Sequence, residues 1–320
     1  MKKKPRYLVI GSINMDLVLQ VSSIPSAGES CLADQYRYSA GGKGANQAAA
    51  ASRLGADVAF IGKIGDDANG LQLLETQKAF GVDTSFLKTD PHAPTGLAVV
   101  MVEPDGKNRI LVFPGSNMLL MPEDVVPVIE SGMYDVLIIQ LEIPRQTVIA
   151  ACRAALKRNI PVVVDAGPVQ SFPLHEIAGV TILSPNETET LALCGIYPDT
   201  KEKARKAAGL LMEKSQAKYV VIKRGEHGAY VYGEGIECNC DAPHVSAVDT
   251  TAAGDAFTAA LAIAMMETGD ILKAVEYANC VGALTVTRAG AQSSLPGTME
   301  VEEFMRTAMC NRTGVQRPIA

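Results

Sequence analysis

Short apolar runs alternate along most of the chain with longer stretches whose apolar positions recur every three or four residues. The short runs predict buried strands and the longer stretches predict helices. The predicted strands are residues 7–11, 58–62, 136–140, 162–165, 181–183 and 219–223. The predicted helices are residues 45–54, 147–158, 187–193, 203–214, 253–266, 271–287 and 301–309. Strands that are apolar on both faces indicate an α/β fold, in which helices cover both faces of a mainly parallel central sheet.

Two stretches break this alternation, residues 14–40 and residues 95–114. Both contain strand-like segments, and Pro104-Asp105-Gly106 lies between two apolar runs, as in a β-hairpin. We interpret the two stretches as one small β-sheet that forms a lid over a site at the ends of the central strands. Residues 1–312 are therefore expected to form a single domain, with residues 313–320 as a flexible tail.

The composition narrows the class of protein. The chain of 320 residues is 48% hydrophobic and 20% charged, with a net charge of −6. This charge argues against nucleic acid as a partner, and no apolar run approaches the roughly 18 residues that span a membrane. Seven scattered cysteines suit the reducing cytoplasm, and the close pair Cys238 and Cys240 lacks the further ligands typical of a zinc site.

The segment from Val248 to Phe257 carries the strongest chemical signal. Its small residues and aspartates predict a strand end, a tight loop and the start of a buried helix. The backbone amides of Ala252, Ala253 and Gly254 would open that helix, and helix N-termini bind anions. A carboxylate beside an anion site suits a base that deprotonates a hydroxyl attacking a phosphoryl group. Asp255 is therefore the candidate base, and a helix-capping aspartate is the alternative.

A glycine loop forms the second signal, Gly41-Gly42-Lys43-Gly44-Ala45-Asn46. It is not a Walker A loop, because Gly44 stands where Ser or Thr should follow the lysine, and the first strand does not lead into G-x-G-x-x-G. The loop presents a cation and a carboxamide together, which suits the hydroxyl groups of a polyol. The alternative is a glycine turn with a solvated lysine.

Other polar residues also follow the predicted strands. Asn14 and Asp16, two residues apart, could bind vicinal hydroxyls or form an Asx turn, and Glu142 has the same two interpretations. Asn186 and Glu189 could order water around Mg²⁺–phosphate or cap a helix. The turn from Lys223 to Gly228 could line a polyphosphate or simply close a hairpin.

In order along the chain, these motifs are similar to those of the ribokinase-like carbohydrate kinases of the PfkB family. The matching motifs are Gly11-Ser-Ile-Asn-Met-Asp16, Gly41-Gly-Lys-Gly-Ala-Asn46, Pro185-Asn-Glu-Thr-Glu189, Asp249-Thr-Thr-Ala-Ala-Gly-Asp255 and Thr287-Arg-Ala-Gly-Ala-Gln292. The resemblance runs from about Tyr7 to Met309, and the glycine and Asp255 loops are its most specific parts. It implies the ribokinase-like fold, with the small sheet as the lid.

The resemblance also implies a role for each matching residue. Asp255 would be the catalytic base. The sugar would be held by Asn14, Asp16, Gly42, Lys43, Asn46, Glu142 and Asp255. The ATP site would be lined by Asn186, Lys223, Gly225, Gly228, Ala253, Gly254 and Asn279, although a smaller hydroxyl residue is common in the family at the position of Lys223. Glu189 would order Mg²⁺ through water. K⁺ would be bound, mostly through backbone carbonyls, by Asp249, Thr251, Thr285, Arg288, Gly290 and Ser294.

The implied activity is ATP-dependent phosphorylation of D-ribose at its 5-hydroxyl by a homodimer that pairs through the lid. Close rivals are the same chemistry on 2-deoxyribose, a ketohexose or a nucleoside. Asn14 and Asp16 favour a pentose with adjacent hydroxyls. A catalytically silent sugar sensor is the rival of another class, and the intact Asp255 and Gly254 count against it.

Overall fold

The computed structural model describes residues 4–104 and 108–313, and within them the central sheet is a nine-stranded one. Its strand order is β13 (Ile236–Cys240), β12 (Ala229–Gly233), β11 (Tyr219–Lys223), β10 (Ile182–Ser184), β9 (Val162–Asp165), β8 (Val136–Gln140), β1 (Arg6–Ile10), β4 (Asp57–Gly65) and β5 (Leu87–Asp90). The strands from β5 to β11 are parallel, and β12 and β13 continue the sheet antiparallel. The predicted mainly parallel sheet is thus confirmed.

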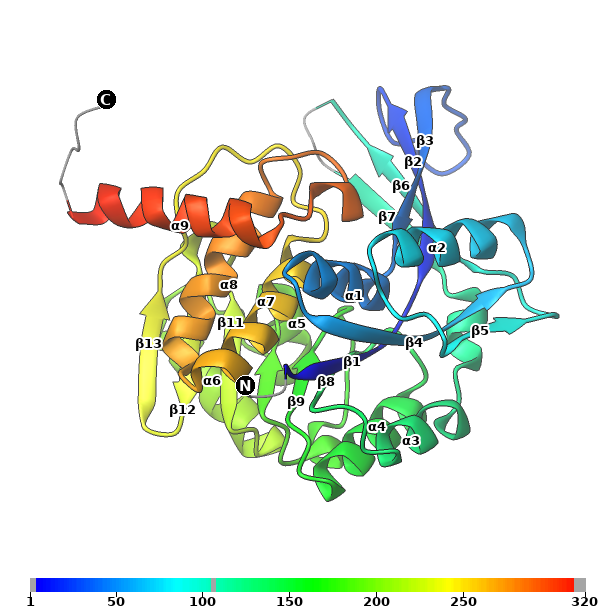
Figure 1. The fold of residues 1–320 in the computed structure, drawn as a ribbon. Helices are drawn as coiled ribbons and strands as arrows, with labels where there is room; N and C mark the ends of the chain where they lie inside the picture. Colours follow the sequence, from blue (N-terminus) through cyan, green and yellow to red (C-terminus); the bar gives the residue numbers. More distant parts are fainter. Residues whose placement is uncertain (1–3, 105–107, 314–320) are drawn as a thin grey trace.

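Helices cover both faces of this sheet (Figure 1). One face carries α1 (Lys43–Arg53), α2 (Ala68–Ala79), α7 (Ala253–Thr268), α8 (Ile271–Thr285) and α9 (Thr298–Thr313). The other carries α3 (Pro122–Glu130), α4 (Arg145–Lys157), α5 (Glu187–Cys194) and α6 (Lys201–Ser215). Successive strand residues enter opposite cores, since Val9 packs with the first set of helices and Leu8 and Ile10 with the second.

Small side chains allow α1 and α7 to pack closely on one another. Their buried alanines include Ala45, Ala48 and Ala49 on α1 and Ala256 and Ala260 on α7. Because alanine ends at its β-carbon, two such faces can approach without large side chains between them. The close approach brings the first turn of α1 beside the first turn of α7.

The small sheet has the strand order β3 (Ala33–Gly41), β2 (Asn14–Val21), β6 (Gly96–Val102) and β7 (Asn108–Phe113). It stands away from the central sheet at the upper right of Figure 1. β6 and β7 pair antiparallel, as the hairpin signal predicted. Of the predicted turn, Asp105 and Gly106 lie outside the described residues, and so do residues 314–320 of the predicted tail.

The sequence pattern missed some elements and misplaced one. It did not predict α2, α3 or β5, because α2 buries few residues, α3 contains two prolines and β5 is short and largely polar. The predicted strand end before Asp249 is wrong. β13 ends at Cys240, and residues 241–252 are irregular, with the amides of Val248 and Asp249 both donating to the carbonyl of Val286. No helix in the described part of the chain is long and apolar enough to cross a membrane.

Candidate active site

Asp255 lies in the first turn of α7, inside the helix and not at its cap. The N-cap is Ala252, in a left-handed conformation (φ 61°) and without a capping side chain, so the helix-capping interpretation of Asp255 is wrong. The amide of Ala253 donates to the carbonyl of Thr250 (3.3 Å). The amides of Gly254 and Asp255 lie too early in the helix to find an intrahelical acceptor. The helix start therefore offers two backbone donors beside a buried carboxylate.

The glycine loop delivers α1 to this carboxylate. Gly42 is the N-cap of α1 with φ +89°, and a β-carbon there would lie 2.6 Å from the α-carbon of Ile13. Only glycine fits this close backbone approach. The turn places the Asn46 amide nitrogen 2.8 Å from Asp255 Oδ2 and the Lys43 ammonium 3.9 Å from Asp255 Oδ1.

Asp165 and Lys223 form an ion pair beneath Asp255, from the ends of β9 and β11. Lys223 Nζ donates to Asp165 Oδ1 at 2.8 Å, and both side chains are buried. A β-carbon on Gly254 would lie 3.8 Å from Lys223 Nζ, so this ammonium is next to the start of α7. Sequence reasoning missed Asp165, although an aspartate ending a fully apolar strand was an available signal.

Gln47 was missed as well. It follows Asn46 on α1, and its amide nitrogen lies 2.8 Å from Asp165 Oδ2 and 3.4 Å from Asp255 Oδ1. A glutamine inside an alanine-rich helix carries no sequence signal of this kind. The contacts nevertheless connect the ion pair to the candidate base.

Burial and charge act in opposite directions on these groups. Burial opposes the charge on Lys43, but the carboxylates of Asp255 and Asp165 outweigh it and raise the lysine pKa. Burial raises the pKa of Asp255, and the ammonium of Lys43 counteracts only part of that shift. For Asp165 the balance is reversed, because Lys223 and Lys43 overcome burial and lower its pKa. The Asp165 charge is thus firmly held, whereas Asp255 is poised to accept a proton.

The sugar-binding candidates Asn14 and Asp16 lie on β2 of the small sheet, and Glu142 lies in the loop after β8. Asn14 Oδ1 accepts from the Asn117 amide at 2.7 Å. Ser12 Oγ donates to Glu142 Oε2, which is also 3.5 Å from the Lys43 amide. Asp16 lies against Gly41, where a β-carbon would come within 2.2 Å of its Oδ2. Burial, together with the charges of Glu142 and Asp255, raises the pKa of Asp16 to about 7.

The capping interpretation of Asn186 and Glu189 is confirmed, and their role in ordering water around Mg²⁺ stays a prediction. They form a capping box at the start of α5: the Glu189 amide donates to Asn186 Oδ1 (2.8 Å) and the Asn186 amide to Glu189 Oε2 (2.7 Å). The other oxygen, Oε1, turns inward. A β-carbon on Gly167 would lie 2.6 Å from Lys43 Nζ and 2.7 Å from Glu189 Oε1, so the two groups meet over this glycine. Glu189 therefore faces the same space as Lys43.

Gly225 and Gly228 shape the turn between β11 and β12. Both have positive φ (52° and 76°), and a β-carbon on Gly228 would lie 2.0 Å from the carbonyl oxygen of Cys240. Asn279 of α8 donates to that same carbonyl at 2.9 Å. The glycine turn, the end of β13 and α8 therefore meet at Cys240.

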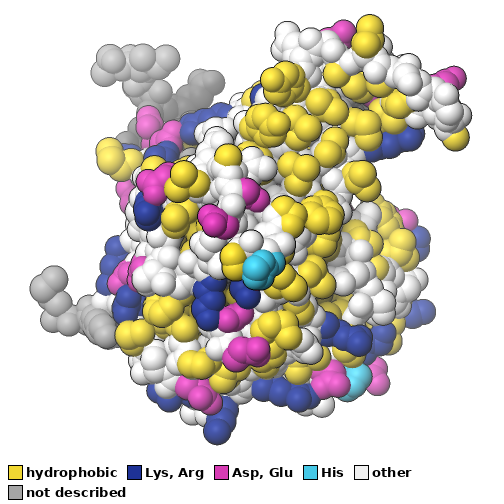
Figure 2. All heavy atoms as spheres, turned by 90° about the vertical axis from the view of Figure 1, so that its right-hand side faces the viewer, with side chains coloured by type: hydrophobic (Ala, Val, Ile, Leu, Met, Phe, Trp, Pro, Cys, Tyr) yellow, Lys and Arg dark blue, Asp and Glu magenta, His cyan; other side chains and the backbone are white. Residues whose placement is uncertain are grey.

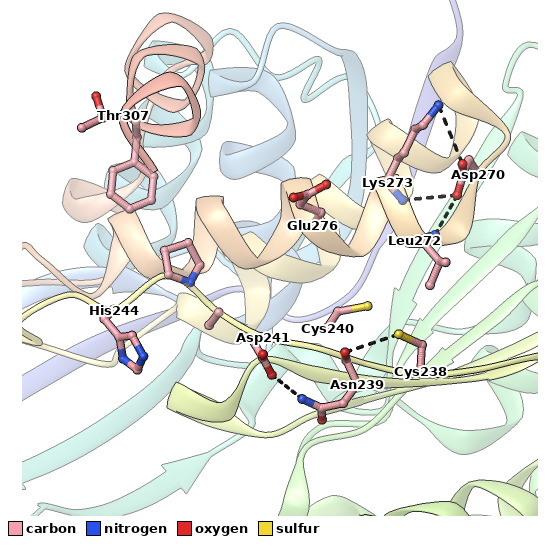
Figure 3. Close-up of a pocket in the computed structure, with 13 residues that line it drawn as sticks. Cys238, Asn239, Cys240, Asp241, His244, Asp270, Leu272, Lys273, Glu276 and Thr307 are labelled. Carbon is pink, nitrogen blue, oxygen red and sulfur yellow. Dashed lines mark hydrogen bonds and ion pairs between the residues drawn. The ribbon is translucent and has the colours of Figure 1, made fainter. Parts of the chain in front are cut away.

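A cavity of about 860 Å³ lies beside this junction, between β13, α8 and α9 (Figure 3). Figure 3 shows Cys238 and Cys240 on β13 with Glu276 on the facing helix. Asp255 does not line this cavity, and neither do the side chains around it, namely Lys43, Asn46, Gln47, Asp165 and Lys223. Both cysteines are free, and the described residues contain no group of three or more His, Cys, Asp or Glu that could hold a metal ion.

The two candidate cation loops are held together by Asp249. Its Oδ1 accepts from the amide (2.9 Å) and hydroxyl (2.6 Å) of Thr251, and its Oδ2 accepts from the Gly290 amide (2.9 Å). Burial would raise the pKa of Asp249, but these hydrogen bonds lower it. The polar side-chain groups of the remaining candidates have partners of their own: Thr285 with Val281 O, Ser294 with Ala291 O, and Arg288 with Glu300. The Arg288 side chain has no acceptor, so a ligand from this residue would be its backbone carbonyl.

Comparison with known proteins finds similarity over nearly the whole chain. The model of the pfkB family carbohydrate kinases matches residues 4–298. A ribokinase from Haemophilus influenzae is 36% identical over 302 residues, covering 94% of this chain and 98% of that protein. A deoxyribokinase from Salmonella typhi is 32% identical, covering 93% and 97%. The structure of Arabidopsis thaliana ribokinase complexed with ribose and ATP matches with a TM-score of 0.87 at 32% identity, covering 95% and 99%.

The pKa of Asp16 predicts how stability varies with pH. The carboxyl has a pKa of about 7 in the folded chain against an ordinary 3.8, so the folded state binds more protons between these values. The free energy of unfolding therefore falls as pH rises through this interval. Asp16→Asn removes the effect and should be more stable than the parent chain at pH 8, by about 1 kcal/mol or more.

Urea unfolding at pH 4, 6 and 8 measures this difference. Asp34→Asn, an exposed carboxylate on the neighbouring strand β3, is the matched control and should follow the parent chain at every pH. Parallel pH curves for Asp16→Asn and the parent chain would contradict the raised pKa.

Proposed function

The chain belongs to the pfkB family of carbohydrate kinases, and we propose that it is an ATP-dependent ribokinase that phosphorylates D-ribose at its 5-hydroxyl. One observation supports phosphoryl transfer most directly. The buried carboxylate of Asp255 stands beside free amides at a helix N-terminus and is held by Asn46, with Lys43 nearby. This arrangement provides a proton acceptor, an anion site and a balancing charge at one point.

The reaction follows from these positions. The 5-hydroxyl gives its proton to the carboxylate of Asp255 as its oxygen forms a bond to the γ-phosphorus of ATP. The bond from that phosphorus to the bridging oxygen breaks, and ADP leaves with the bonding electrons. The amides of Gly254 and Asp255 donate to the phosphoryl oxygens where negative charge accumulates, and Lys43 balances the charge from the sugar side.

The nucleotide would lie along the ends of β10 to β13 and the start of α7. Its proposed contacts are Asn186, Lys223, Gly225, Gly228, Ala253, Gly254 and Asn279. Mg²⁺, held by Glu189 through water, would neutralise phosphate charge. Glu189 fits that role because its Oε1 turns into the site while its Oε2 is fixed by the Asn186 amide. Lys223 lies at the anion site but is paired with Asp165, so it contributes charge without being free to move.

Asn14, Asp16 and Glu142 support a pentose as the substrate, with Gly42 and Asn46 completing the sugar site. A 2-deoxyribokinase is the nearest alternative, because a deoxyribokinase is almost as similar to the chain as the ribokinases are. A ketohexose or nucleoside kinase would share the same base. A silent sugar sensor would not need a buried carboxylate with a raised pKa beside an anion site.

The proposed base, Asp255, can be tested by mutation. Asp255→Asn keeps the side-chain shape but cannot accept a proton, so kcat should fall by about 10²–10⁴ while sugar binding persists.

ADP release by the parent chain, measured with ribose, 2-deoxyribose, fructose and a nucleoside, should be fastest with ribose. Normal turnover in a folded Asp255→Asn would contradict the assignment of the base, and a preference for another sugar would contradict only the substrate.

We further propose that a K⁺ ion between the two loops at Asp249 orders the start of α7. The lowered pKa of Asp249 keeps its carboxylate ionised, and carbonyls with one carboxylate suit a large monovalent cation. Activity should therefore be higher in potassium chloride than in sodium or caesium chloride at equal ionic strength. Asp249→Ala should abolish the difference. Identical rates in the three salts would rule out the cation site and leave the kinase assignment intact.

We also propose that the chain forms a homodimer through the small sheet. Ile110, Leu111, Val112 and Phe113 of β7 are exposed, by 70% at Leu111, and Tyr36 and Tyr38 of β3 are exposed as well. Figure 2 shows hydrophobic side chains gathered on this projecting part of the surface, as is typical of an interface. Sedimentation velocity should find a dimer, and Leu111→Asp should shift it to monomer. Leu191→Asp, an exposed leucine on α5, should not.

A further inference from the structure

A chain of buried, hydrogen-bonded side-chain amides leads to each of the two oxygens of the Asp255 carboxylate. On one side, Asn46 donates to Oδ2 at 2.8 Å. The Asn46 oxygen accepts from Gln292 of the loop before α9 at 3.2 Å, and the Gln292 oxygen accepts from Gln77 of α2 at 3.2 Å. We call this chain of hydrogen-bonded amides, Asn46–Gln292–Gln77, the first relay. Its members come from three elements that are far apart in the sequence.

A second relay reaches the other oxygen. Gln47 donates to Asp255 Oδ1 at 3.4 Å and to Asp165 Oδ2 at 2.8 Å, so its NH₂ group bridges two carboxylates. The Gln47 oxygen accepts from Gln140 at the end of β8 at 2.6 Å. All five amide side chains of the two relays are at most 5% exposed, namely Asn46, Gln47, Gln77, Gln140 and Gln292.

The carboxylate sets the direction of both relays. An ionised carboxylate only accepts hydrogen bonds, so the amide beside it must present its NH₂ group. Its oxygen then points away and must accept from the next amide, which repeats the same orientation. Both relays end on an oxygen without a hydrogen-bond partner among the described residues, Gln77 Oε1 and Gln140 Oε1. A buried oxygen without a hydrogen-bond partner is destabilising.

The orphan oxygen of Gln140 is enclosed by Gly11. A β-carbon at Gly11 would lie 1.8 Å from Gln140 Oε1, so this oxygen packs directly on the backbone of the strand end. Turning the Gln140 amide over would set its oxygen against that of Gln47, acceptor to acceptor. The observed direction therefore leaves one oxygen unsatisfied but keeps the Gln140 amide donating to Gln47, whose own NH₂ group donates to Asp165 and Asp255.

We propose that Gln47, Gln77, Gln140 and Gln292 are positioning residues that fix the orientation of the Asp255 carboxylate toward the acceptor hydroxyl. The inference rests on the proposed role of Asp255 as the base. Of the two relays, only Asn46 is also a sugar-binding candidate. The relays hold both oxygens from the sides, which leaves the remaining lone pairs of the carboxylate directed at the substrate.

Gln140→Met and Gln140→Glu provide the test. Methionine matches the length of glutamine but cannot donate, so the Gln47 oxygen loses its partner and the Gln47 side chain is no longer held from the side opposite Asp255. We expect kcat to fall by about tenfold, with KM for sugar and ATP within about twofold of the parent values, because misalignment affects the reacting group more than ground-state binding. Gln77→Met should act in the same way through the first relay.

Gln140→Glu adds a readout that a purely structural role would not change. The protonated acid donates to Gln47 as the amide does, but the carboxylate cannot. Relative to the parent chain, kcat of Gln140→Glu should be near normal at low pH and fall to the Gln140→Met level as pH rises. The ratio to the parent chain cancels only the pH dependence that both chains share; the charged groups near Asp255 are Lys43, Lys223, Asp165 and Asp16.

Thr147→Val and Ser215→Ala are matched controls. Each removes a buried hydroxyl that donates to a backbone carbonyl, of Leu120 and Leu211 respectively, far from the relays. They should lower the urea midpoint and leave kcat unchanged. The relays are refuted if Gln140→Met and Gln77→Met turn over normally while Asp255→Asn does not, or if the kcat ratio of Gln140→Glu is independent of pH. Normal turnover by Asp255→Asn would instead refute the role of Asp255 as the base, on which this inference rests.

Discussion

Burying the carboxylate of Asp255 is the constraint on which the arrangement of the site depends. A buried charge is costly unless it is paired and hydrogen-bonded, and this one also stands at the start of α7, where we propose that phosphate binds. The nearby ammonium of Lys43 and the side-chain amide of Asn46 stabilise the charge on the Asp255 carboxylate. The compensation is incomplete, so the pKa of Asp255 stays raised, which suits a group that must take up a proton.

The hydrophobic core makes this compensation possible. Lys43, Asn46 and Gln47 reach Asp255 because α1 and α7 approach closely through their alanines, and because Gly42 lets α1 start against the backbone of Ile13. Larger side chains at the helix interface would move the donors away from the carboxylate. Packing that looks purely structural therefore sets the geometry of the proposed chemistry.

The fold class could be predicted from the sequence. The gathering of the polar strand ends at one site could also be predicted, because the carboxyl ends of parallel strands meet at the same edge of a sheet. Asp255, Lys43 and Asn46 do lie together there. The relays could not be predicted. Gln47 and Gln140 are 93 positions apart, and buried amides have no sequence pattern that identifies their partners. For α2 and β5 the pattern was too weak, since tertiary contacts and not amphipathic periodicity hold them in place.

The Asp165–Lys223 ion pair accounts for a lysine at position 223, where the resemblance to the family predicts a smaller hydroxyl residue. A buried lysine in place of a small hydroxyl residue would be strongly destabilising alone, but Asp165 lies 2.8 Å away and its pKa is lowered by that lysine. Without Lys223, the carboxylates of Asp165 and Asp255 would share the Gln47 amide with only Lys43 to balance them. Their repulsion would raise the pKa of Asp255 further. Asp165 and Lys223 are therefore coupled, and replacing either one changes the charge balance at Asp255, the proposed base.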